Sequence, residues 1–156
     1  MNTVLFHTMN GIAIITTAVV FGTNVFFAVV GKAAAAKSKE SSIADLVGHF
    51  HEIADVRMPF FGVCAMVATL IQVILADLGN ITGQLTGLAL AALLAHLFIY
   101  FAIAKPINTV MVEGVKYGRV LNNIRELQQR WDKVIGLRAW LLLIAILALI
   151  VVNYLP

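Results

Sequence analysis

The chain lacks the charge that a water-soluble protein needs. Only 12% of its 156 residues are Asp, Glu, Lys or Arg, whereas 61% are hydrophobic and the mean hydropathy is +0.94. Soluble domains carry roughly 25% charged residues, and disordered chains are poor in hydrophobic ones. The composition therefore excludes both classes and indicates a single membrane domain over residues 1–156.

Cysteine is also scarce, and glycine-rich phosphate-binding motifs are missing. The single cysteine, Cys64, excludes an intramolecular disulfide and a cysteine-rich metal site. No Gly-x-Gly-x-x-Gly or Walker-type loop is present, so a nucleotide has no visible cradle. We expect the lipid bilayer and an apolar small molecule as partners, and no nucleic acid.

Charged residues divide the chain into four apolar segments. None precedes Lys32, 19 uncharged residues separate Arg57 from Asp77, 27 separate Asp77 from Lys105, and 18 follow Arg138. About 20 apolar residues cross a bilayer as a helix, and backbone groups in lipid must pair internally. We predict an all-α polytopic membrane protein, a bundle of four transmembrane helices with spans near residues 9–31, 57–76, 83–104 and 135–155.

The basic residues predict the orientation. All eleven Lys and Arg lie in or beside the segments that join the first span to the second and the third to the fourth. The positive-inside rule places these two segments in the cytoplasm and both termini outside, in the inner membrane if the protein is bacterial. No basic residue precedes the first apolar stretch, so we expect that helix to be retained rather than cleaved as a signal peptide.

The connecting segments also contain helical patterns. The Ala/Lys composition of residues 32–37 favours a helix that continues past the membrane. Ser41 and Ser42 would interrupt it, and a short amphipathic helix from Ile43 would lead into the second span. Between the third and fourth spans we predict a cytoplasmic amphipathic helix, whose apolar face would comprise Val120, Ile124, Leu127 and Trp131.

Small residues recur every four positions at the start of the third span. This ridge allows another helix to approach closely. The contact lies either inside the bundle, which we prefer because four helices must first pack together, or between subunits of a homo-oligomer. The ridge comprises Gly83, Gly87, Ala91 and Ala95.

Ionisable residues within a membrane indicate function by default. His96 lies eight residues, or about 12 Å, from the end of its span at 1.5 Å per residue. Tyr100 is one turn away on the same face, and Asn24 has a similar depth on the first span. The alternative is a neutral histidine that hydrogen-bonds to a neighbouring helix.

A second cluster surrounds the start of the second span. His51 and Asp55 share one helix face, as do His49 and Glu52. Either pair suits a metal site or a base with its orienting carboxylate, and the alternative is a solvated loop end.

The predicted topology gathers the polar groups in one half of the membrane. We therefore predict a polar pocket open to the cytoplasm, beneath an almost purely apolar outer half. Its members would be Asn24, His51, Asp55, Arg57, His96, Tyr100, Asn108, Glu113, Trp131 and Arg138.

The second half of the chain has Lys105-Pro106-Ile107-Asn108, then a long polar stretch, then Arg130-Trp131-Asp132 and Arg138 before a final apolar segment. In this pattern it resembles the anthrone-oxygenase-like family of small four-helix membrane proteins. That family's pattern is Asn-x-Pro-x-Asn after the third span, then an Arg/Trp segment and an arginine at the start of the fourth span. Pro106, Asn108, Trp131 and Arg138 match it, whereas Ala104 replaces the first asparagine. The similarity covers about residues 95–150 and is weaker around Phe21 to Phe27. It implies a four-helix domain and, for some members, oxidation of an anthrone to an anthraquinone by O₂.

These observations lead to one enzymatic hypothesis in two versions. In the first, an oxygenase or oxidoreductase acts on an apolar or aromatic substrate without a cofactor. His51 or His96 would remove a C–H proton, Asp55 would orient the imidazole, and Arg57 or Asn108 would stabilise the oxyanion. The residues expected to bind the substrate are Asn24, Tyr100, Glu113, Trp131 and Arg138. In the second version, a copper or iron ion is held by His49, His51 and His96.

The alternative is a non-enzymatic membrane protein, either an accessory subunit or a carrier of small molecules or lipids. The polar groups would then hold the bundle together or bind a headgroup. A third comparison, with the trimeric glutathione-dependent four-helix membrane enzymes, ranks lower because their arginine-rich motif is missing.

Overall fold

The computed structural model describes residues 3–155, and that part of the chain is helical apart from short connections. Four helical stretches are long and apolar enough to cross a membrane. The first comprises α1 (Thr3–Phe26), a single π-helical turn η1 (Phe27–Gly31) and α2 (Lys32–Lys37). The second is α3 (Glu40–Leu75). The third comprises α4 (Ile81–Ile99), a second π-helical turn η2 (Tyr100–Ala104) and α5 (Lys105–Lys116), and the fourth is α6 (Ile124–Val152).

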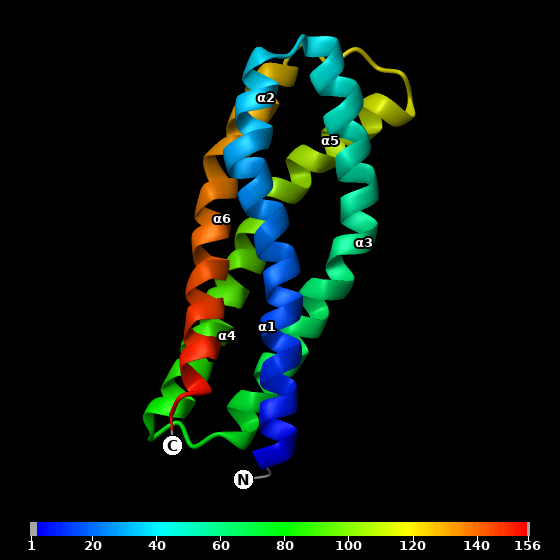
Figure 1. Ribbon diagram of the computed structural model, residues 1–156. Coiled ribbons are helices and arrows are strands. Elements are labelled where there is room, and N and C mark those ends of the chain that lie inside the picture. Colours follow the sequence, from blue (N-terminus) through cyan, green and yellow to red (C-terminus); the bar gives the residue numbers. More distant parts are fainter. Residues whose placement is uncertain (1–2, 156) are drawn as a thin grey trace.

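The four stretches lie side by side in an elongated bundle (Figure 1). Helix α1 packs against α3 and α6, and α4 packs against the same two helices, so the order around the bundle is α1, α3, α4, α6. Both termini lie at one end with the α3–α4 turn (Figure 1). We call this the terminal end and the opposite end, with the α2–α3 and α5–α6 connections, the connection end. The all-α fold with four long apolar helices is as predicted.

Local sequence signals explain where the helices begin and end. Ser38 and Lys39 both have extended backbone conformations, which separates α2 from α3. The side chain of Asn80 accepts a hydrogen bond from the Gly83 N–H at 2.9 Å and caps α4. Gly118, with φ of +61°, follows the end of α5 and provides the left-handed conformation that such a helix end favours.

The predictions for the connecting segments were partly wrong. Residues 32–37 do continue the first helix, but the break falls at Ser38–Lys39, and Ser41 and Ser42 lie in the first turn of α3. An amphipathic helix does lie between the third and fourth spans, but it is α5, continuous with η2. Residues from Ile124 onward already belong to α6, where Ile124, Leu127 and Trp131 are buried. Val120 precedes α6 and is exposed.

The half of the bundle near the terminal end is not purely apolar, which corrects the sequence prediction. Its core consists largely of small residues, among them Ala13, Ala65, Ala89 and Ala145. These allow close helix contacts. Five polar side chains are buried with them, and all except Thr17 donate a hydrogen bond to a helix carbonyl. They are Asn10, Thr17, Thr69, Gln72 and Thr86.

The small-residue ridge of α4 contributes only in part to packing between helices. Gly83 is buried, and a Cβ atom there would collide with the backbone of Asp77 in the preceding turn. Gly87 is partly buried and Ala91 is exposed. The homo-oligomer that this ridge suggested stays a prediction.

Candidate functional site

The carboxylate of Asp55, on α3, is the centre of a hydrogen-bonded cluster that links three elements. Its Oδ1 accepts hydrogen bonds from the Tyr100 hydroxyl at 2.7 Å and from Asn108 Nδ2 at 3.1 Å. Its Oδ2 accepts one from Lys105 Nζ at 3.0 Å. The side chain is 13% exposed. Three donors, one of them cationic, satisfy the ionised carboxylate in this sheltered position.

The π-helical turn η2 explains how Tyr100 and Lys105 reach the same carboxylate. In a regular α-helix, residues five apart differ by about 140° around the axis and face different neighbours. In η2 the backbone N–H of Lys105 donates instead to the carbonyl of Tyr100, so the turn contains an extra residue. Such turns occur frequently at functional sites. Pro106 follows directly and has no N–H to offer the preceding turn.

His96 and Arg138 form a second polar contact, between α4 and α6. His96 Nδ1 lies 3.4 Å from the carbonyl oxygen of Arg138, and its Nε2 lies 3.3 Å from Arg138 Nη2. A neutral imidazole with its proton on Nδ1 satisfies both contacts. The guanidinium also stacks over the Tyr100 ring, 5.2 Å from its centroid. Arg138 is buried in the bundle, and this contact joins the His96 pair to the Asp55 cluster.

His51 and Trp131 form the aromatic part of the site. Their ring centroids are 5.2 Å apart, and Trp131 also packs edge-on against Phe27 of η1 at 5.5 Å. Both residues are buried. Within residues 3–155, neither His51 Nε2 nor Trp131 Nε1 has a hydrogen-bond partner. The hydrogen bonds of Asp55 go to Tyr100, Lys105 and Asn108, so the expectation that Asp55 orients a histidine was wrong.

A cavity of about 580 Å³ lies between the helices, and all of these residues line it. Its walls come from α1, η1, α3, α4, η2, α5 and α6, and most of the lining side chains are apolar. Buried polar atoms normally have a partner, but six at this cavity have none among the residues that the structure describes. They are Thr17 Oγ1, Asn24 Oδ1, His51 Nε2, Asn108 Oδ1, Trp131 Nε1 and Arg138 Nε.

Three residues expected at the site lie elsewhere. Arg57 is exposed on α3 and does not line the cavity. Glu113 is exposed and lines a separate hollow between α3 and α5. His49 is exposed and pairs with Glu52 at 3.2 Å. In the described part of the chain, no group of three or more His, Cys, Asp and Glu side chains is arranged to hold a metal ion.

Lys105 is the functional residue that sequence reasoning missed. It lies at the end of the third apolar run, where a lysine normally extends to the headgroups. The Lys-Pro-Ile-Asn motif was the available signal, since it places the cation three residues before Asn108. Helical spacing alone does not turn Lys105 toward Tyr100, because that alignment depends on η2.

Comparison of the chain with models of known protein families, with curated proteins and with solved structures gives no match. The resemblance to the anthrone-oxygenase-like family stays a prediction. Of the residues that carry it, Asn108, Trp131 and Arg138 line the cavity, whereas Pro106 is exposed. The function is therefore inferred from the chemistry of the cavity.

Proposed function

We propose that the protein is a membrane-embedded oxygenase or oxidoreductase acting on an apolar, aromatic small molecule that binds in the cavity. The observation that carries this proposal is the set of six unpartnered polar atoms on a mostly apolar wall. Ligand cavities typically measure about 300–1,000 Å³ and combine apolar walls with a few convergent polar groups. The cavity of about 580 Å³ fits both criteria.

The unpartnered atoms indicate the polar groups that the ligand carries. Asn24 Oδ1 and Asn108 Oδ1 are acceptors and suit hydroxyl groups, whereas Trp131 Nε1 and Arg138 Nε are donors and suit a carbonyl or phenolate oxygen. A flat aromatic ketone or phenol offers both kinds of group on an apolar body. Such a molecule would reach the cavity from the lipid, since the lining residues Val63 and Phe101 are also exposed on the outside of the bundle.

The same arrangement supports removal of a proton from carbon. His51 Nε2 is buried at the cavity and has no partner among residues 3–155, as a base needs. It would take a proton from a CH₂ group next to an aromatic carbonyl, and the electron pair would move onto the carbonyl oxygen. Donors from Arg138 and Trp131 would stabilise the negative charge that develops there.

Molecular oxygen would be the oxidant of the second step. The carbanion transfers electrons to O₂ and forms a C–O bond, and the peroxide anion takes back the proton held by His51. The resulting hydroperoxide loses water to leave a new carbonyl group. In total, one CH₂ group and one O₂ give one C=O group and one water. Asp55 has a supporting role, because its three hydrogen bonds fix Tyr100 and Asn108 at the cavity wall.

One observation favours the non-enzymatic alternative. Hydrogen bonds from Tyr100, Lys105 and Asn108 satisfy the Asp55 carboxylate and connect α3 with η2 and α5, as a purely structural polar contact would. The protein would then bind or carry the aromatic molecule without changing it. The two functions differ in whether His51 is needed for turnover or only for binding.

The test uses the full chain in lipid nanodiscs. Oxygen uptake is measured with a panel of anthrones and naphthols, and binding is measured separately by quenching of Trp131 fluorescence in a Trp140→Phe background. We expect uptake that His51→Ala reduces at least about 100-fold, as for loss of a general base, while binding persists. His7→Ala, an exposed histidine on α1, is the matched control and should retain full activity.

The outcomes separate the alternatives. Binding without oxygen uptake would establish the carrier and refute the enzyme. Equal uptake by wild type and His51→Ala would refute His51 as the base. Neither binding nor uptake across the panel would overturn the assignment of the cavity to aromatic ligands.

A further inference from the structure

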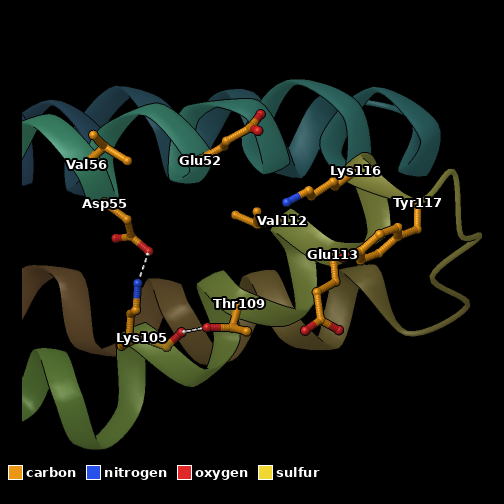
Figure 2. Close-up of a pocket in the computed structure, with 9 residues that line it drawn as sticks. All are labelled: Glu52, Asp55, Val56, Lys105, Thr109, Val112, Glu113, Lys116 and Tyr117. Carbon is orange, nitrogen blue, oxygen red and sulfur yellow. Dashed lines mark hydrogen bonds and ion pairs between the residues drawn. The ribbon is translucent and has the colours of Figure 1, made fainter.

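A second hollow, of about 400 Å³, lies between α3 and α5 toward the connection end. We call it the cleft. Figure 2 shows Glu52 of α3 and Thr109, Glu113 and Lys116 of α5 around it. Its walls therefore carry charges of both signs and a hydroxyl group, which water solvates readily. The chemistry of the cleft contrasts with that of the mostly apolar cavity inside the bundle.

The cleft and the cavity share two lining residues, Asp55 and Lys105. Their ion pair, drawn as a dashed line at one edge of the cleft in Figure 2, therefore lies where the two hollows adjoin. Asp55 Oδ1 accepts from Tyr100 and Asn108, which line the cavity but not the cleft. Asp55 Oδ2 accepts from Lys105, whose side chain is 42% exposed. One carboxylate thus bonds to the cavity wall with one oxygen and to the partly exposed cation with the other.

We infer that the cleft is the aqueous port of the cavity, and that water and protons pass between them at the Asp55–Lys105 pair. The need for such a port rests on the proposed function, since that reaction forms a water molecule inside a mostly apolar cavity, and that molecule has to leave. The route itself follows from the two shared residues.

The hydrogen bonds also provide a path along which protons exchange between the cavity and the cleft, although the reaction as a whole releases none. The Tyr100 oxygen takes up a proton on the cavity side while its own O–H bond breaks and a new O–H bond forms on Asp55 Oδ1, 2.7 Å away. The Asp55 carboxyl group then loses a proton to water in the cleft and regains its negative charge. Lys105 stabilises that charge, so the pair returns to its starting state.

The test measures how fast water reaches the cavity, with no substrate present. The indole N–H of Trp131 lines the cavity without a partner in the described chain, and its exchange with D₂O is followed by NMR. Only two tryptophans occur, so Trp140→Phe assigns the signal. We expect Lys105→Met to accelerate exchange about fivefold, the factor for losing one partly exposed ion pair.

Two further variants complete the experiment. Lys116→Met removes the other lysine of the cleft, which has no contact to Asp55 in the structure described, and should leave the rate unchanged. Thr109→Phe places a ring in the cleft without removing the ion pair, and should slow exchange. Thr109 is exposed, so this variant keeps the inference testable if Lys105→Met does not fold.

Unchanged exchange in Thr109→Phe would overturn the port, because water would then reach Trp131 by another route. Equal acceleration in Lys105→Met and Lys116→Met would refute the role of the Asp55–Lys105 pair. Because exchange is measured without substrate, these results are independent of oxygen uptake. Failure to detect oxygen uptake would therefore not refute the port, and unchanged exchange in Thr109→Phe would not refute the enzyme function.

Discussion

The two halves of the bundle bury polar side chains in different ways. Near the terminal end, Thr69, Gln72 and Thr86 donate to carbonyl groups of their own helices, at 2.8, 3.3 and 3.1 Å. Asn10 departs from this pattern, because it donates across to the Leu149 carbonyl of α6. Near the connection end, Asp55 accepts hydrogen bonds from η2 and α5. Polar groups that bond within one helix leave neighbouring helices free to pack closely. Polar groups that bond across elements hold helices in a fixed relation without filling the space between them.

Side-chain size reinforces this difference. Alanines dominate the core of the terminal half and bring the helices close together. In the connection half, Phe27 and Trp131 pack edge to face and Trp131 contacts His51, so large rings take the place of small residues. The cavity of about 580 Å³ begins where these rings and the cross-helix bonds meet, and it extends to Ala65 and Leu142 of the alanine-rich core. Uncharged Thr, Asn and Gln side chains are buried in the terminal half, whereas ionisable side chains line the hollow.

The largest expected effect comes from truncating the tightly packed half. Leu149→Ala removes a fully buried side chain of that core and should lower the free energy of unfolding by about 2–5 kcal/mol. Met58→Ala, at the cavity wall, should cost less than about 1 kcal/mol, because the space beside it is already empty. Unfolding in mixed micelles measures both. Equal losses would contradict the difference in packing between this core and the cavity wall.

A smaller loss is expected where the cross-helix bonds are removed. Asp55→Ala leaves the Lys105 cation and the donors of Tyr100 and Asn108 without their acceptor. We expect destabilisation of about 2–3 kcal/mol, below the value for a fully buried pair because Lys105 is partly exposed. Asp45→Ala on the exposed face of the same helix is the control and should be neutral. Neutral behaviour of both variants would show that the cluster does not hold the connection half together.

The smallest effects concern polar residues of the terminal half. The Asn10 side chain donates to the Leu149 carbonyl at 3.0 Å and to Asn153 Oδ1 at 2.8 Å. Asn10→Leu should cost about 1 kcal/mol, as for other hydrogen bonds between membrane helices. Thr69→Val removes only a bond within its own helix and should cost less than about 0.5 kcal/mol. The same unfolding assay tests both, and a larger loss for Thr69→Val would reverse the interpretation.

Much of the fold was predictable because long uncharged segments leave few alternatives. The four spans, their helical form and the continuation of the first helix through residues 32–37 follow from composition and backbone chemistry. The site was predictable only in part. Helical spacing related His96 to Tyr100, and both contact Arg138 in the structure. The same helical spacing suggested that Asp55 orients a histidine. In the structure the hydrogen bonds of Asp55 go to Tyr100, Lys105 and Asn108 instead.

The sequence by itself determined the class of protein, since a backbone in lipid satisfies its hydrogen bonds only within helices when no barrel pattern is present. The tertiary structure alone decided which polar groups meet. A π-helical turn depends on the packing of neighbouring helices, and its single extra residue rotates Lys105 onto the face of Tyr100. The burial of Arg138 beside His96 likewise requires α4 and α6 to be in contact.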